Sequence, residues 1–140
     1  MALIRKCQTG GGSSLSRVYA EDQWQRACQA LRSAETLLPI SADDAASRAY
    51  YAAFHAVSAL FATQNQTFSK HTAIRAAVHR DLVRTGAWSA TLGEAFDALW
   101  ELRNTGDYGS GIHVSDEDAV AAVTTAREII AAVAKDGSFN

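Results

Sequence analysis

Apolar residues recur at alternating steps of four and three through residues 17–38, the spacing that gathers them on one face of an α-helix. They are Ala20, Trp24, Ala27, Leu31, Ala34 and Leu38. Residues 115–135 show the same spacing, in Ala119, Val123, Ala126, Ile130 and Val133. A helix with such a face buries it against other helices, so the pattern predicts a helical bundle.

Residues 41–64 are expected to form the central helix of this bundle. Ser41 is a good N-cap, and Asp44 stands three residues later, at the capping-box position. The apolar arc that follows is too wide for a helix packed on one side only. It comprises Ala46, Ala49, Tyr50, Ala53, Phe54, Ala56, Val57, Leu60 and Phe61.

Two further helices are predicted in the second half of the chain. One covers residues 70–84 with Ser69 as its cap, and the other covers residues 91–104 and is ended by Gly106. We therefore predict an all-α fold, an up-and-down bundle of four main helices with residues 70–84 as a shorter fifth. Glycine and serine at positions 10–14 indicate a flexible tail over residues 1–16, which leaves the bundle at 17–135 and a frayed end at 136–140.

Charge and cysteine content narrow the functional classes. The net charge of −2 shows none of the overall basicity that is typical of nucleic-acid-binding proteins, although a local patch can still bind them. Two cysteines do not make a disulfide framework, so a cytoplasmic protein is expected. No apolar run has the length of a membrane span, so no membrane partner is predicted.

Metal and cofactor motifs are absent from the sequence. The Glu-x-x-His pairs of dimetal bundles do not occur. His71 and His79 are two helical turns apart, too far to share one ion. The glycines at positions 10–12 lack the lysine and the spacing of a phosphate-binding loop. We predict neither a metal site nor a cofactor.

Arg103 occupies an unusual position for a charged residue. On a helix over residues 92–104 it shares an arc with Phe96 and Leu99, where a cation is costly unless something pairs with it. Asp107 and Tyr108 follow directly after the expected break. One interpretation is a last-turn cation that complements the helix dipole. The other is a site for an anionic ligand.

A second polar set runs along the central helix, where Arg48, Tyr51 and His55 share one stripe. Arginine can bind phosphate, tyrosine can stack on a base, and histidine can titrate near neutrality. The helix over 70–84 adds a basic face, of which Lys70, His71 and Arg75 are candidate nucleotide- or RNA-binding residues. A solvated polar face would explain both sets equally well.

Three stretches of the chain are similar to one protein family. They are Ser47-Arg48-Ala49-Tyr50-Tyr51-Ala52-Ala53-Phe54-His55-Ala56, Ser69-Lys70-His71, and Leu102-Arg103-Asn104-Thr105-Gly106-Asp107-Tyr108-Gly109. In this order they resemble the HEPN domain family, in its small stand-alone prokaryotic branch. The resemblance covers roughly residues 17–135. It implies a helical bundle that forms homodimers, metal-independent endoribonuclease activity in many members, and frequent pairing with a minimal nucleotidyltransferase in toxin–antitoxin systems.

The family's ribonuclease motif is matched only in part. It consists of an arginine, a polar residue, and a histidine after four to six intervening residues. Arg103 and Asn104 match, but the histidine position falls on Tyr108, Gly109 or Ser110, and His113 comes too late. A tyrosine is a poor general base at neutral pH. The resemblance makes Arg103, Asn104, Asp107 and Tyr108 the candidate catalytic residues of a degenerate motif.

Three functional hypotheses follow. The leading one is a homodimer that binds a nucleotide, RNA or a nucleotidyltransferase partner at Arg103. The second is an active ribonuclease in which His55, His113 or Asp107 replaces the missing base, and the third is a non-catalytic dimeric interaction module. The first predicts that Arg103 and Asp107 line a cleft formed with the partner subunit, near Arg48 or Tyr51.

Overall fold

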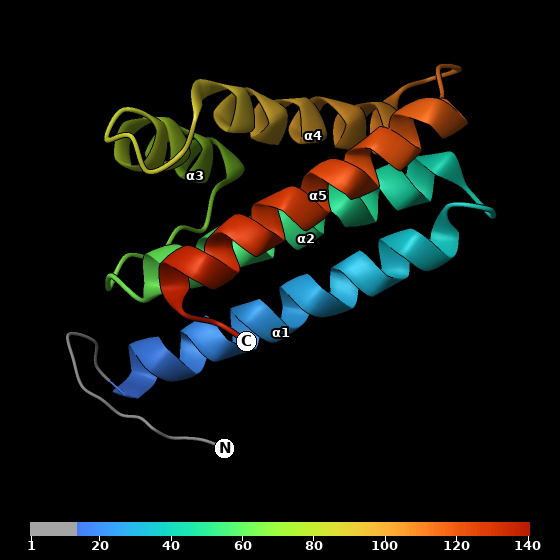
Figure 1. Ribbon diagram of the computed structural model, residues 1–140. Coiled ribbons are helices and arrows are strands. Elements are labelled where there is room, and N and C mark those ends of the chain that lie inside the picture. The colour runs from blue at the N-terminus through green and yellow to red at the C-terminus, as the bar shows by residue number, and fades with distance from the viewer. Residues whose placement is uncertain (1–13) are drawn as a thin grey trace.

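A computed structural model of the chain describes residues 14–140, which form helices and loops with no strand (Figure 1). The elements are α1 (Ser14–Leu37), α2 (Ala42–Ala62), α3 (His71–Ala77), the π-helix η1 (Val78–Val83), α4 (Ala90–Tyr108) and α5 (Asp116–Gly137). Four helices are long, and α3 with η1 forms the shorter segment. The predicted all-α bundle is confirmed.

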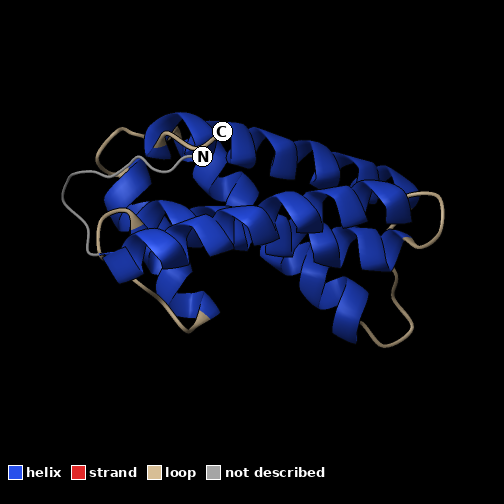
Figure 2. Ribbon diagram, turned by 90° about the horizontal axis from the view of Figure 1, so that it is seen from below, coloured by secondary structure: helices blue, strands red, loops and turns tan. Residues whose placement is uncertain are grey.

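Helix α2 is the centre of the bundle. It contacts α1, α4 and α5, and Figure 1 shows it between α1 and α4, with α5 crossing in front of it. The alanines at positions 45, 49, 52, 53, 56 and 59 are fully buried, which brings the neighbouring helices close to its backbone. Seen from below in Figure 2, the connecting loops gather at the two ends of the bundle. The wide apolar arc read from the sequence therefore corresponds to contacts on several sides.

Serine caps start three of the long helices. Ser41 Oγ accepts a hydrogen bond from Asp44 N at 3.1 Å, as predicted, and Ser115 Oγ accepts one from Asp118 N at 3.0 Å. Ser89 caps α4 in the same way. The predicted cap at Ser69 is wrong, because Lys70 takes the N-cap position and its side chain makes no capping bond.

Helix α4 continues past the glycine that was expected to end it. Gly106 is helical, and α4 ends at Tyr108, where the N–H of Gly109 donates to Thr105 O at 2.9 Å. A Cβ on Gly106 would lie 2.7 Å from the carbonyl oxygen of Asp43 at the start of α2. Glycine is therefore needed here for the close approach of two backbones, and Asp107 and Tyr108 stand on the helix rather than after it.

The ends of the chain differ from the predicted domain limits. Helix α1 begins at Ser14, inside the expected tail 1–16, of which residues 1–13 lie outside the described part of the chain. Helix α5 extends to Gly137, and Phe139 stacks on Trp24 with ring centres 4.8 Å apart. This aromatic contact packs the C-terminal segment, expected from the sequence to be frayed, against α1.

Between residues 14 and 140, no helix is long and apolar enough to cross a membrane.

Candidate functional site

Arg103 lies in the last turns of α4 and reaches toward the central helix. Its Nη2 donates a hydrogen bond of 2.7 Å to Tyr51 Oη on α2, and only 12% of its side chain is exposed. The cation is therefore set between two helices, beside one of the two α2 residues that the sequence named. Its place relative to a partner subunit stays a prediction.

The rest of the guanidinium is only partly paired. Nη1 donates to Asn104 Oδ1 at 3.2 Å. Nε lies 3.0 Å from Asp107 Oδ2, yet its N–H does not point at the carboxylate, so Nε is a buried donor without a hydrogen bond among residues 14–140. Asp107 is therefore an ion-pair partner of Arg103 by distance, without a hydrogen bond to Nε. Nη1 and Nη2 carry four N–H groups and use two of them, which leaves donors for a ligand.

Aromatic rings surround this cation. Arg103 Cζ lies 5.4 Å from the ring centre of Tyr51 and 5.2 Å from those of Trp100 and Tyr108, and Arg48 Cζ lies 4.8 Å from the Tyr51 ring. Burial lowers the pKa of Arg103, whereas Tyr51, Tyr108 and Asp107 raise it, and the net shift is upward. Arg103 therefore stays charged in its partly buried position. Tyr108 is 70% exposed and presents its ring to solvent.

His71 enters the same cluster from α3. Its Nδ1 lies 2.7 Å from Tyr50 Oη, and its ring centre is 4.8 Å from that of Trp100. Burial and then the charge of Arg103 lower the pKa of His71. Tyr50 is fully buried, and burial raises the pKa of its phenol well above the usual range.

The groups proposed to replace the missing histidine lie in three different settings. His55 Nδ1 lies 2.8 Å from Gln23 Oε1 of α1, and burial followed by the charges of Arg26 and Arg48 lowers its pKa. His113 pairs with Asp43 at 2.7 Å, and 74% of its side chain is exposed. Asp107 is already the ion-pair partner of Arg103. None of these contacts brings a free base to the guanidinium.

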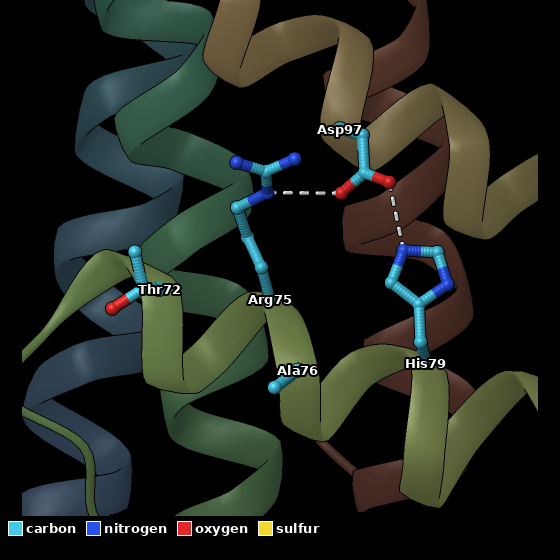
Figure 3. Close-up of a pocket in the computed structure, with 5 residues that line it drawn as sticks. All are labelled: Thr72, Arg75, Ala76, His79 and Asp97. Carbon is cyan, nitrogen blue, oxygen red and sulfur yellow. Dashed lines mark hydrogen bonds and ion pairs between the residues drawn. The ribbon is translucent and has the colours of Figure 1, made fainter.

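The basic side chains of α3 and η1 do not all lie at the same site. Arg75 Nε lies 3.1 Å from Asp97 Oδ1, and His79 Nε2 lies 2.8 Å from Asp97 Oδ2. Figure 3 shows both side chains pointing from α3 and η1 toward Asp97 on α4, at a pocket of about 190 Å³. Lys70 is exposed to solvent. Arg75 is therefore paired by a carboxylate, whereas His71 belongs to the cluster around Arg103.

No group of three or more histidine, cysteine, aspartate or glutamate side chains within residues 14–140 could hold a metal ion.

Comparisons with known proteins identify the family. The sequence profile of the HEPN domain matches residues 20–136. The chain belongs to the HEPN domain family. It is 36% identical over 91 residues to a UPF0332 protein of Thermotoga maritima, a match covering 65% of this chain and 69% of the relative.

Two other matches are more distant. A Methanocaldococcus jannaschii protein named as a candidate toxin is 30% identical over 77 residues, which cover 55% of this chain and 52% of that protein. A solved structure of a Thermus thermophilus protein superposes with a TM-score of 0.73 at 24% identity, over 84% of this chain and 97% of the other. The likeness to the Thermus thermophilus structure supports the fold alone.

The sequence analysis missed two residues of this HEPN site, Trp100 and Tyr50, and it also missed Asp97, the carboxylate that pairs with Arg75. Trp100 lies three residues before Arg103, a spacing that places both on one side of α4. Tyr50 was assigned to the core, where its ring indeed lies, but its hydroxyl binds His71. Asp97 carried no sequence signal, because an isolated carboxylate on a helix is usually solvated.

Proposed function

We propose that this HEPN protein binds single-stranded RNA, with a phosphate at Arg103 and a base against Tyr108. The observation that carries the proposal is the partly paired Arg103 guanidinium, only 12% exposed, held by Tyr51 and lying 5.2 Å from the exposed Tyr108 ring. Arginine N–H groups suit phosphate oxygens in geometry and charge. Single-stranded RNA offers unstacked bases that aromatic side chains can cover.

The charges around Arg103 support an anionic ligand. Arg48 is exposed beside Tyr51, and Lys70 is exposed next to His71. Asp107 is the one carboxylate within ion-pair distance of Arg103 in the described chain. The same donors could bind the phosphate of a free nucleotide, so RNA and nucleotide share one recognition chemistry.

We further propose that the protein acts as a homodimer whose Arg103 and Asp107 face the partner subunit. A toxin-like role beside a minimal nucleotidyltransferase is the biological setting that the HEPN resemblance implies. The name of the Methanocaldococcus jannaschii relative supports that role. Light scattering on the purified protein, alone and with such a nucleotidyltransferase, tests both parts. A monomer at all working concentrations would overturn the dimer.

Fluorescence anisotropy with a labelled, unstructured RNA in the presence of chelator tests the binding proposal. Arg103→Ala should weaken binding about tenfold or more, because hydrogen bonds to charged groups contribute about 1.5–3 kcal/mol. Tyr108→Ala should weaken it about fivefold or more through lost stacking. Arg127→Ala is the matched control, since Arg127 pairs with Glu35 at 2.7 Å on exposed surface.

Folding is monitored by circular dichroism, and Arg103→Gln, which removes the charge and keeps a polar side chain, replaces the alanine variant if that variant unfolds. Equal RNA affinity for folded Arg103 variants, the Arg127→Ala control and the unchanged protein would refute the site.

A further inference from the structure

His71 lies beside Arg103, although α3 and the end of α4 are far apart in the sequence. Both rest against Trp100, with the His71 ring centre at 4.8 Å and Arg103 Cζ at 5.2 Å from its ring. The His71 ring centre and Arg103 Cζ can therefore be no farther apart than the sum of these two distances. Both also contact the Tyr51 ring, His71 at 6.2 Å and Arg103 at 5.4 Å. The two side chains therefore belong to one cluster.

Tyr50 determines which nitrogen of His71 carries the proton. Tyr50 Oη lies 2.7 Å from Nδ1, which is its single hydrogen-bond partner among residues 14–140. A buried hydroxyl that finds no acceptor is destabilising, so the phenol donates to Nδ1. The imidazole proton then lies on Nε2. Nε2 makes no hydrogen bond to any residue in the described part of the chain.

We propose that the Nε2–H of His71 and the unused N–H groups of Arg103 together hold one phosphate group. The inference rests on the proposed function, since the phosphate is that of the RNA or nucleotide bound at Arg103. A phosphate group carries several acceptor oxygens, so one group can accept hydrogen bonds from two donors that belong to the same cluster. His71 thereby donates a hydrogen bond to the phosphate from α3, and Arg103 donates to it from α4.

The surroundings of His71 keep it an uncharged donor. Tyr50 and Tyr51 face it from α2 and Arg103 acts on it from α4, while Lys70 precedes it on its own segment. The described structure places no carboxylate against the ring, and burial and Arg103 both lower the pKa of His71. With Nδ1 occupied by Tyr50 and a proton on Nε2, the ring has no free lone pair. His71 is therefore a ligand for phosphate and not the base of a ribonuclease.

Paired variants test the donor. His71→Gln places an amide N–H near the position of Nε2, whereas His71→Ala removes it. In the same anisotropy assay with unstructured RNA, His71→Ala should weaken binding about threefold to tenfold, and His71→Gln should stay within about twofold of the unchanged protein. Nitrogen NMR of histidine-labelled protein, assigned with the glutamine variant, should show His71 protonated on Nε2.

The pH dependence separates a neutral donor from a cation. Affinity should stay flat between about pH 7 and pH 8, because the pKa of His71 lies below its ordinary 6.5 and the ring is uncharged there. A rise in affinity as the pH falls through about 6.5, lost in His71→Ala, would overturn the inference.

Other outcomes identify which statement fails and what the ligand is. If Arg103→Ala weakens binding and His71→Ala does not, the His71 inference fails while the proposed function stands. If neither variant matters, the proposed function fails. Competition with adenosine 5′-monophosphate and with inorganic phosphate supports a phosphate contact, and its strength relative to unlabelled RNA distinguishes a free nucleotide from a polynucleotide.

Discussion

Arg103 Nη2 donates a 2.7 Å hydrogen bond to Tyr51 Oη, and this bond joins the end of α4 to the middle of α2. The same guanidinium lies 5.4 Å from the Tyr51 ring centre. Tyr51 thus contacts Arg103 in two ways, through a hydrogen bond to its hydroxyl and through a cation–π interaction with its ring. The pair orients a cation that a helix end alone would leave to solvent.

Replacing Tyr51 by phenylalanine tests this bond. The variant keeps the ring and removes the oxygen, which leaves an Arg103 N–H unpaired between the helices. The free energy of unfolding should fall by about 1–2 kcal/mol, measured by urea denaturation. Tyr19→Phe, on α1, is the control. If both variants were equally stable, the bond would be energetically unimportant.

Removing the charge of Asp107 should strengthen RNA binding. Its carboxylate lies 3.0 Å from Arg103 Nε and repels an incoming phosphate. Asp107→Asn should raise the affinity about threefold at low salt, with a smaller gain at high salt because ions screen the repulsion. Glu101→Gln removes a carboxylate from an exposed position on the same helix. Weaker binding by Asp107→Asn than by this control would mean that the carboxylate mainly positions Arg103.

Gly106→Ala should destabilise the protein, although alanine favours helices more than glycine does. The new Cβ would lie 2.7 Å from Asp43 O, a backbone atom that cannot rotate away. We expect a loss of roughly 1–3 kcal/mol from this overpacking in urea denaturation. Glu101→Ala should change stability by less than about 0.5 kcal/mol. A more stable Gly106→Ala variant would mean that α4 and α2 can separate.

The ionisation of Asp43 makes the free energy of unfolding depend on pH in the acid range. Its carboxylate accepts hydrogen bonds from Val114 N and from His113, and the first of these is the main cause that lowers the pKa of Asp43 below its ordinary 3.8. Because the folded-state pKa is depressed, this stabilisation is complete above 3.8 and is lost as the pH falls through the lower value.

Denaturation at a series of acid pH values measures this effect. Asp43→Asn should be less stable than the unchanged protein near neutrality, and the difference should shrink as the pH falls. A difference that stays constant with pH would contradict the assignment.

The helices could be predicted because their signals are local. The steps of four and three through Trp24 and Val123, and the caps at Ser41 and Ser115, depend on residues within a turn or two. The errors lie where a distant backbone overrides local propensity. Gly106 lies within α4 where the backbone of Asp43 approaches it closely, and Phe139 stacks on Trp24 of α1.

The sequence alone determined the helical bundle, its central helix and the arginine that does not fit an apolar stripe. Those features follow from helical periodicity and from the cost of burying a charge, which operate along one segment. Only the tertiary structure decided what surrounds Arg103. His71 comes from α3 and Tyr51 from α2, and the packing of the helices is what brings these two rings to the cation, beside Trp100 of its own helix. Contacts between side chains so far apart along the chain exist only after the helices have packed, so no spacing in the sequence records them.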